Sequence, residues 1–290
     1  MKALVTGAYG FVGRFLIAEL TAASWEVVTV SGSDTAERVI NLTASLKNDR
    51  PDVVFNMAGV TRADNFADFY LGNTVFVSQL LDAVSRLPEP PLVILAGSAA
   101  EYGALPAGSG PVSEDTPCHP MTHYGISKYA QTLMGLKQAA AGFPVIVARI
   151  WNPVGPGMPR HLALSNFASQ IAAMPPEGGE LRVGNLDVER DFVDVREVAR
   201  LIVALANCRA ALGTVVNVCS GRAWSLRSLV NSMIRIADRR INLVLDMSRV
   251  RQQETPLLCG DAGRMITFGL KPSAPDFDHV LLEIMASARN

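Results

Sequence analysis

The sequence lacks several features that mark export, metal binding or nucleic-acid binding. Its four cysteines, at positions 118, 208, 219 and 259, include no C-x-x-C pair, which argues against a disulfide framework and a zinc site. The net charge is −1 with 18% charged residues, so no positive excess favours a nucleic acid. Glycines interrupt the apolar segment 1–20, which argues against a signal peptide or membrane span. We expect a reduced, cytoplasmic protein that contacts neither nucleic acid nor membrane.

Short β-branched runs alternate with helical patterns through the first half of the chain. This alternation predicts an α/β fold with a doubly wound parallel sheet covered on both sides. After about residue 152 the sequence turns to loops rich in proline and glycine, with isolated helices such as 164–174. The predicted strands are 2–6, 26–30, 52–58, 91–97, 143–150 and 213–221, and the predicted helices of the first half are 13–24, 73–87 and 128–142.

Gly7, Gly10 and Gly13 follow the first predicted strand and open the first helix. Only glycine lets the backbone turn so tightly and approach a pyrophosphate at the helix N-terminus, where free N–H groups favour anions. We interpret this segment as a dinucleotide-binding turn, with a merely structural turn as the alternative.

The segment after the second predicted strand favours NADP over NAD. A carboxylate normally holds the ribose 2′-hydroxyl of NAD there, but residues 31–33 are Ser-Gly-Ser. Without an adjacent acid to repel it, a 2′-phosphate is acceptable, and Arg14 or Arg38 would neutralise it. Asp34 could still reach back to the ribose, so NAD stays an alternative.

Tyr124 and Lys128 are four residues apart in a helical pattern, which puts them on one face with Cβ atoms about 5–6 Å apart. A cation about 4 Å from the phenol is worth about 4 kcal/mol at an effective dielectric of about 20. That nearly suffices to lower the tyrosine pKa from about 10 to neutrality, although burial of the phenol opposes the shift. A surface pair without function is the alternative.

Together these segments resemble the extended short-chain dehydrogenase/reductase family, whose nucleotide-sugar members are NAD(P)-dependent epimerases, dehydratases and reductases. The resemblance covers nearly the whole chain. It implies a Rossmann-like NAD(P)-binding domain over 1–152, to which 190–222 returns, and a mainly substrate-binding region over 153–290. The matching segments are "TGAYGFVG", "INLTA", "FNMAG", "LGNTVFVSQLLDA", "GSAAEYG", "HYGISK", "RIWNPVGPG", "ERDFVDVREVA" and "VNVCSG".

The resemblance implies that Ser98, Tyr124 and Lys128 form a catalytic triad. Ser98 ends a predicted strand, at the edge where open α/β sheets bind ligands, although a turn serine is the alternative. Its hydroxyl would hold a substrate carbonyl, Tyr124 would transfer the proton, and Lys128 would lower the phenol's pKa and hold the cofactor ribose. The residues expected to contact the cofactor are Gly7, Tyr9, Gly10, Phe11, Val12, Gly13, Ser31, Asn41, Leu42, Met57, Ala58, Gly59, Asn73, Tyr124 and Lys128, with a helix N-cap as the alternative for Asn73.

For the substrate, the resemblance implies that Arg190 clamps the diphosphate, since a planar guanidinium suits two adjacent phosphates. An ion pair with Glu189 or Asp191 is the alternative. Arg251 is a candidate second clamp, with a solvated loop arginine as its alternative. The residues expected to contact the substrate are Ser98, Asn152, Asn166, Arg190 and Arg251.

Ala100 argues against two of the reactions that members of this family catalyse. Family dehydratases carry an acid at this position and the epimerase-reductases of fucose synthesis carry a cysteine, whereas Glu101 would face the opposite way on an extended segment. The reaction type that is left is hydride transfer with Tyr124 as the acid. Because segments 164–174 and 248–264 resemble GDP-4-keto-6-deoxymannose reductases, we expect NAD(P)H-dependent reduction of the 4-keto group of a nucleotide-linked 4-keto-6-deoxyhexose. A nucleotide-sugar 4-epimerase with tightly bound NAD and a non-catalytic dinucleotide-binding sensor or scaffold are the alternatives.

Two further expectations concern partners and metals. Segments 14–23 and 128–136 carry apolar stripes at helical spacing, which predict core packing and a helix pair that forms a homodimer. His119 and His123 have a spacing that could bind a metal on a helix, but Pro120 disfavours a helix there, so no metal is expected.

Overall fold

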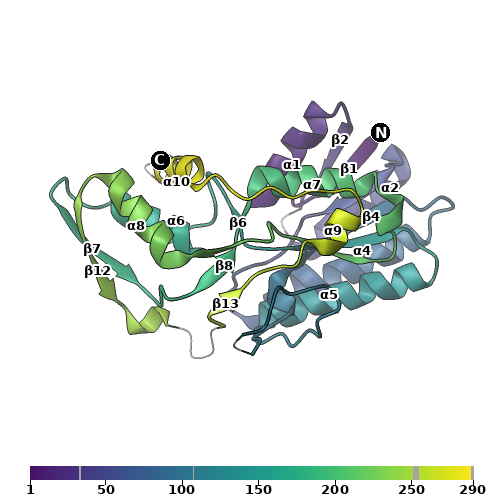
Figure 1. The fold of residues 1–290 in the computed structure, drawn as a ribbon. Coiled ribbons are helices and arrows are strands. Elements are labelled where there is room, and N and C mark those ends of the chain that lie inside the picture. Colours follow the sequence, from purple (N-terminus) through teal and green to yellow (C-terminus); the bar gives the residue numbers. More distant parts are fainter. Residues whose placement is uncertain (33, 107, 251–254, 289–290) are drawn as a thin grey trace.

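The computed structural model describes residues 1–32, 34–106, 108–250 and 255–288, and its centre is one parallel sheet (Figure 1). The sheet has six strands in the order β10-β5-β4-β3-β1-β2, and every pairing is parallel. Because the chain winds outward from β1 in both directions, the predicted doubly wound fold is confirmed. The strands are β1 (Lys2–Thr6), β2 (Glu26–Val30), β3 (Val53–Asn56), β4 (Leu92–Ser98), β5 (Val145–Ile150) and β10 (Val215–Val218).

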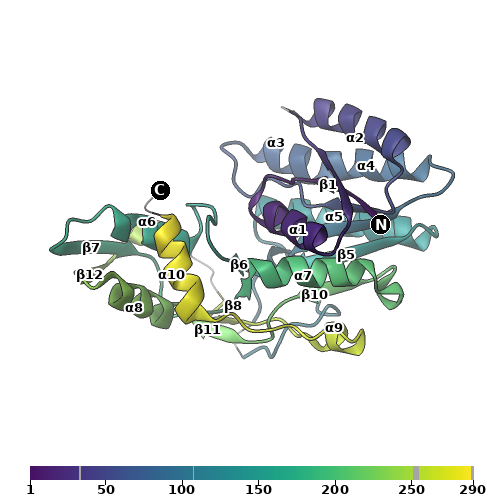
Figure 2. The ribbon, with the colours of Figure 1, turned by 90° about the horizontal axis from the view of Figure 1, so that it is seen from above.

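Helices cover both faces of this sheet (Figure 2). Helices α1 (Phe11–Ala22) and α7 (Val195–Ala206) lie on one face, and α2 (Thr35–Asp49), α4 (Phe76–Ser85) and α5 (His123–Ala140) lie on the other. Alternate strand residues feed the two cores: Ala3 and Val5 pack with α1 and α7, whereas Leu4 packs with α2 and α4.

Helix α2 was not among the predicted helices, although the sequence contains its signals. Val39, Leu42 and Leu46 have helical spacing, and the Asp34 carboxylate accepts the Glu37 N–H at 2.8 Å as an N-cap. The segment "INLTA", in which the resemblance implies that Asn41 and Leu42 contact the cofactor, lies within this helix.

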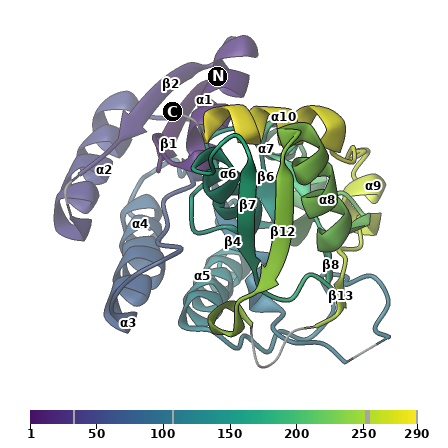
Figure 3. The same cartoon turned by 90° about the vertical axis from the view of Figure 1, so that its left-hand side faces the viewer.

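A smaller region packs around a second core. Its main helices are α6 (Ala163–Ala172), α8 (Leu226–Ala237) and α10 (Phe277–Ser287), which bury apolar faces against one another. Strands β7 (Gly178–Val183) and β12 (Arg240–Leu245) pair in parallel beside them (Figure 3). The short elements are α3 (Phe66–Phe69), β6 (Pro153–Val154), β8 (Glu189–Asp191), β9 (Val193–Asp194), β11 (Ala223–Ser225), β13 (Leu257–Leu258) and α9 (Gly263–Thr267), with a π-helix at Tyr70–Val75 and 3-10 turns at Ala99–Glu101, Arg209–Ala211 and Met247–Arg249.

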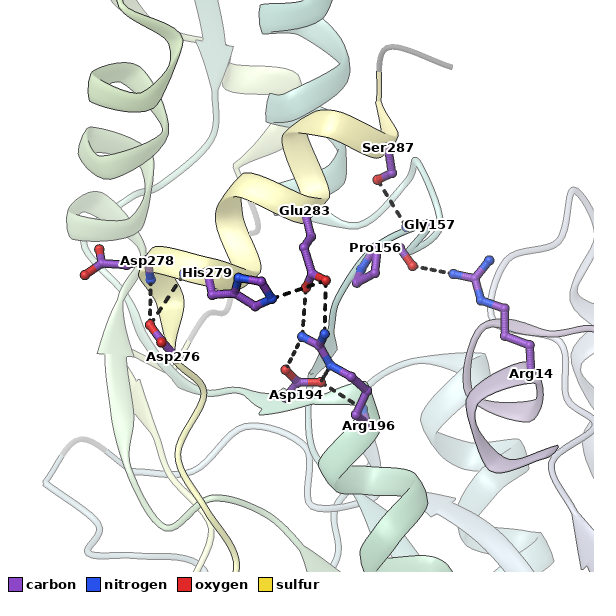
Figure 4. Close-up of polar contacts among 10 residues, drawn as sticks. All are labelled: Arg14, Pro156, Gly157, Asp194, Arg196, Asp276, Asp278, His279, Glu283 and Ser287. Atoms are coloured by element: carbon purple, nitrogen blue, oxygen red, sulfur yellow. Dashed lines mark hydrogen bonds and ion pairs between the residues drawn. The ribbon is translucent and has the colours of Figure 1, made fainter. Parts of the chain in front are cut away.

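Polar contacts join α10 to the sheet region (Figure 4). Arg196, in the first turn of α7, pairs with Asp194 at 2.7 Å and with Glu283 of α10 at 2.8 Å. Within the smaller region, one helical turn further along α10, the Ser287 hydroxyl accepts the Gly157 N–H at 3.2 Å. The two cores are therefore held together by an ion-pair network as well as by chain connections.

None of the helices in the described part of the chain combines the length and the hydropathy that a membrane span requires. Within the same residues, histidines, cysteines and carboxylates form no group of three that could hold a metal ion.

Candidate active site

The glycine-rich turn after β1 leaves no space for a side chain at Gly7 or Gly13. Gly7 has a φ of +69°, and a Cβ added to Gly13 would lie 2.0 Å from the Gly7 carbonyl oxygen. Gly10 precedes α1 without a side-chain cap, and the first turn of α1 contains no acid. The first N–H groups of α1 are therefore free to bind an anion, as a dinucleotide pyrophosphate requires.

The segment after β3 closes on this turn. A Cβ on Gly7 would lie 2.5 Å from the Ala58 nitrogen, and a Cβ on Gly59 would lie 3.6 Å from the Lys128 ammonium nitrogen. Met57 packs against the core on the α1 side. The turn after β1 and the segment after β3 thus bring their backbones close together, and the N–H groups along this edge of the sheet fit the binding of a dinucleotide.

Ser98 and Tyr124 meet where β4 and α5 come together. Ser98 is the last residue of β4, and its hydroxyl accepts the Ala100 N–H at 3.2 Å. Tyr124 lies in the first turn of α5, where a Cβ on Gly125 would be 2.6 Å from the Ala100 carbonyl oxygen. This close approach brings the first turn of α5, which carries Tyr124, next to the end of β4, which carries Ser98.

The pKa of Tyr124 differs in direction from the prediction. Burial raises it above the ordinary value of 10, and the Ser98 side chain opposes the rise without reversing it. The expected lowering by Lys128 does not contribute to this shift. The phenol is therefore protonated at neutral pH, which is the state that a proton donor needs.

Lys128 is 4% exposed and donates to the Gln131 side-chain oxygen at 2.9 Å. Burial lowers its pKa to about 8, against the attraction of Glu101. At pH 7 about nine-tenths of the molecules still carry the ammonium charge. Gln131 was not predicted, although it lies three residues after Lys128 on the same helix face.

Two side chains of α2 hold the turn after β2. The Arg38 Nε donates to the Gly32 carbonyl at 3.3 Å, and the Asn41 amide donates to the Ser31 carbonyl at 2.8 Å. Arg38 therefore lies against the segment where a ribose 2′-phosphate is expected.

The other residues considered for the ribose are engaged elsewhere. Asp34 caps α2, and the Arg14 guanidinium donates to the Pro156 carbonyl across the interface with the smaller region (Figure 4). Of the two arginines proposed to neutralise a 2′-phosphate, Arg38 is the one at the ribose end.

Some of the predicted cofactor contacts have other surroundings in the structure. The Leu42 side chain is fully buried in the core under α2, so its assignment as a cofactor contact is corrected to a packing role. Tyr9 is 80% exposed. Phe11 packs toward the second core and Val12 toward the core on the α1 side.

Asn73 is neither exposed nor an N-cap. It lies buried in the π-helix, accepts the Val60 N–H at 2.8 Å, and donates to the Ser127 hydroxyl at 2.9 Å. It thereby ties the segment after β3 to α5, beside Gly59. A π-turn at this place is consistent with a functional site.

Three of the predicted substrate residues, Asn152, Asn166 and Arg190, lie on the smaller region or its border. Arg190, in β8, donates to the carbonyls of Thr255 and Pro256 at 2.8 and 3.3 Å. Asn152 donates to the Asp191 carbonyl at 2.6 Å.

Asn166, in α6, accepts from Arg249 at 2.5 Å and from Gln170 at 2.8 Å. Arg249, in the 3-10 turn before residue 251, was not predicted as a neighbour of Asn166. Arg251 lies outside the described residues.

A doubly wound sheet with a glycine-rich turn and a serine, tyrosine and lysine at its carboxyl edge defines an NAD(P)-dependent oxidoreductase of the short-chain dehydrogenase/reductase type. Comparison with known families gives the closer assignment. The chain belongs to the NAD dependent epimerase/dehydratase family, whose model matches residues 3–219.

Individual relatives are similar over most of their length. The chain is 32% identical over 281 residues to GDP-6-deoxy-D-mannose reductase of Pseudomonas aeruginosa, covering 93% of this chain and 92% of that protein. It is 32% identical over 250 residues to dTDP-6-deoxy-L-talose 4-dehydrogenase (NAD(P)(+)) of Kitasatospora kifunensis, covering 80% and 78%. The solved structure of RMD from Pseudomonas aeruginosa complexed with NADPH superimposes with a TM-score of 0.88 at 30% identity, covering 99% and 98%.

Proposed function

We propose that this protein reduces the 4-keto group of a nucleotide-linked 4-keto-6-deoxyhexose, with NADPH as the reductant. The observation that carries the proposal is the placement of Tyr124 and Lys128 one turn apart on α5, where the first turn of this helix approaches Ser98 at the end of β4. Ala100 supplies neither the acid nor the thiol that other family reactions need. The named relatives, a reductase and a 4-dehydrogenase of deoxysugars, support the same reaction class.

The side chains have distinct tasks in this reaction. Bound NADPH supplies the hydride. Ser98 donates a hydrogen bond to the carbonyl oxygen, and Tyr124 gives its phenolic proton to the same oxygen. The Lys128 ammonium stabilises the phenolate as it forms, and because it lies in a buried site its charge acts there with little screening. The raised phenol pKa keeps Tyr124 protonated before the reaction, and the Lys128 charge makes the transfer of that proton easier.

We propose Arg38 as the group that selects NADP, because its guanidinium lies against the turn after β2 and the Asp34 carboxylate caps α2. The NADPH-bound relative supports this choice. Gly7, Gly10 and Gly13 with the N-terminus of α1 would hold the pyrophosphate, and Met57, Ala58 and Gly59 would line the other side.

The division of labour along the chain is also a proposal. Residues 1–152 with 190–222 would bind the dinucleotide, and 153–290 would mainly bind the nucleotide sugar. Arg190 would face the diphosphate from β8, and Asn152 and Asn166 would contact the sugar. Arg251 remains a proposal from the sequence.

We further propose a cytoplasmic homodimer. Leu71 and Val75 before α4, together with Ile126 and Leu133 on α5, are exposed apolar side chains on adjoining helical segments. Pairing this face with a second copy would remove it from water. Light scattering of the protein and of an Ile126→Asp, Leu133→Asp double variant tests this: a dimer that becomes a monomer supports the face, and an unchanged mass contradicts it.

The reaction is tested with purified protein, NADPH or NADH, and 4-keto-6-deoxyhexoses linked to GDP, dTDP, UDP or CDP. We expect oxidation of NADPH, followed at 340 nm, and a 4-hydroxy product with at least one of these sugars. Interconversion of 4-hydroxy sugars without net oxidation would instead identify a 4-epimerase. Absence of turnover with every sugar would contradict the proposal.

A further inference from the structure

The carboxylate of Glu101 lies at the junction of three elements behind the candidate triad. It is fully buried and follows Ser98 by one 3-10 turn. One oxygen accepts the Ser98 backbone N–H at 2.7 Å. The other accepts the Thr132 hydroxyl of α5 at 2.8 Å and the Arg149 guanidinium of β5 at 2.9 and 3.1 Å. One side chain therefore connects the end of β4 to a helix and to a neighbouring strand.

The surrounding residues are shaped to hold this carboxylate in place. A Cβ on Gly97 would lie 2.8 Å from one Glu101 oxygen, so only glycine leaves it room there. The Arg149 guanidinium stacks on the Tyr102 ring at 4.4 Å, and its Nη1 is buried without a hydrogen-bond partner in the described residues. A buried ion pair with an unsatisfied N–H is weak support for stability, since apolar residues often serve as well. The geometry of the Glu101–Arg149 pair therefore suits a role other than stabilising the fold.

The hydrogen bond from Thr132 reaches the helix that carries the reacting groups. Thr132 lies one turn beyond Lys128 and two turns beyond Tyr124. Its neighbour Gln131 accepts from Lys128 and donates to the Ala96 carbonyl of β4 at 2.9 Å. Gln131 thus fastens α5 to β4, and Thr132 fastens α5 to Glu101. The same Glu101 carboxylate also accepts the Ser98 backbone N–H.

We propose that Glu101 is a positioning residue: through its bonds to Ser98 and Thr132 it sets the Ser98 hydroxyl in register with the phenol of Tyr124. This inference rests on the proposed reaction, in which both groups must reach one carbonyl oxygen. Glu101 does not touch the substrate. Its contribution is geometric, because small displacements of reacting groups cost large factors in rate.

Two substitutions at Thr132 separate positioning from packing. Thr132→Val keeps the shape and the charges but removes the hydroxyl, whereas Thr132→Ser keeps the hydroxyl and loses a methyl group. We expect Thr132→Val to lower kcat by about tenfold, with KM and the NADPH Kd within about twofold of the parent. Thr132→Ser should restore most of kcat. If Val matches the parent, or if Ser is the more damaging substitution, the hydroxyl link is not what matters and the proposal is overturned.

Glu101→Gln tests the carboxylate itself. An amide in its place must turn an NH₂ group either toward the Ser98 N–H or toward the Arg149 guanidinium, so a donor faces a donor in both orientations. We expect a larger fall in kcat than for Thr132→Val in the folded protein. Should this variant not fold, the Thr132 pair still decides the matter.

Amide exchange at Ser98 supplies a readout that needs no substrate. NMR of the free protein should show faster exchange of the Ser98 N–H in Thr132→Val than in Thr132→Ser, because the acceptor is less firmly held. Equal exchange in both variants would refute the link between α5 and Ser98. Wild-type protein that turns over no keto sugar, while these exchange rates differ as expected, would refute the proposed reaction and leave the link supported.

Discussion

Replacing Lys128 with methionine should make the cofactor-free protein more stable while it destroys turnover. The side chain is 4% exposed, and burial lowers its pKa from 10.5 to about 8. Each pKa unit corresponds to about 1.4 kcal/mol, so holding the charge in the folded protein at pH 7 costs about 3 kcal/mol. Methionine has a similar length and no charge to desolvate.

Part of this gain is offset by the lost hydrogen bond to Gln131, which is worth about 1 kcal/mol. The net expectation at pH 7 is a free energy of unfolding about 2 kcal/mol higher for Lys128→Met than for the parent. The difference in the free energy of unfolding between Lys128→Met and the parent must shrink at alkaline pH. Because the native pKa is the lower one, the folded protein loses its proton first as pH rises, and the cost of the charge falls to about 1 kcal/mol by pH 9.5.

Urea unfolding of the cofactor-free protein at pH 7.0 and 9.5 measures both quantities. Lys137→Met is a matched control, since Lys137 is exposed on the same helix and its replacement should change stability by less than about 0.5 kcal/mol at either pH. A Lys128→Met protein that is less stable than the parent at pH 7, or an advantage that does not decline toward pH 9.5, would refute the reasoning.

Three other predictions address the site. Tyr124→Phe should lower turnover by about 10²–10⁴-fold and keep NADPH affinity, measured by fluorescence titration; unchanged turnover would remove the phenol as the proton donor. Arg38→Ala should weaken NADPH binding by about tenfold and leave NADH binding unchanged, with Arg14→Ala as a control that alters neither; equal losses for both cofactors would mean that Arg38 contacts no 2′-phosphate. Gly13→Ala should abolish dinucleotide binding, because its Cβ would lie 2.0 Å from the Gly7 carbonyl oxygen; retained affinity would show that the turn can shift.

The central sheet could be predicted because its strands are continuous β-branched runs, the pattern of strands buried on both faces. Helix α2 was missed although its cap and apolar spacing were present, because the resemblance suggested a different role for residues 40–44. Several short strands outside the central sheet, such as β8 and β13, have two or three residues, too few for a periodic signal.

The positions of site residues could be predicted where the local sequence pattern determines them. Properties that depend on burial, such as a pKa, could not. Spacing placed Tyr124 and Lys128 on one helix, but the direction of the phenol's pKa depends on how much protein surrounds it, which a sequence does not display. Glu101 shows the same limit: its position next to Tyr102 says little until β4, β5 and α5 bring Ser98, Thr132 and Arg149 around it.

The position of α10 has a consequence for how the chain assembles during synthesis. The last strand of the central sheet ends at Val218, whereas the second core is closed by α10, which follows at Phe277–Ser287. Since domains fold as units from the N-terminus as they leave the ribosome, the sheet can form while the smaller region is still incomplete. Nascent chains therefore acquire the central sheet first, and the Arg196–Glu283 contact is among the last to form.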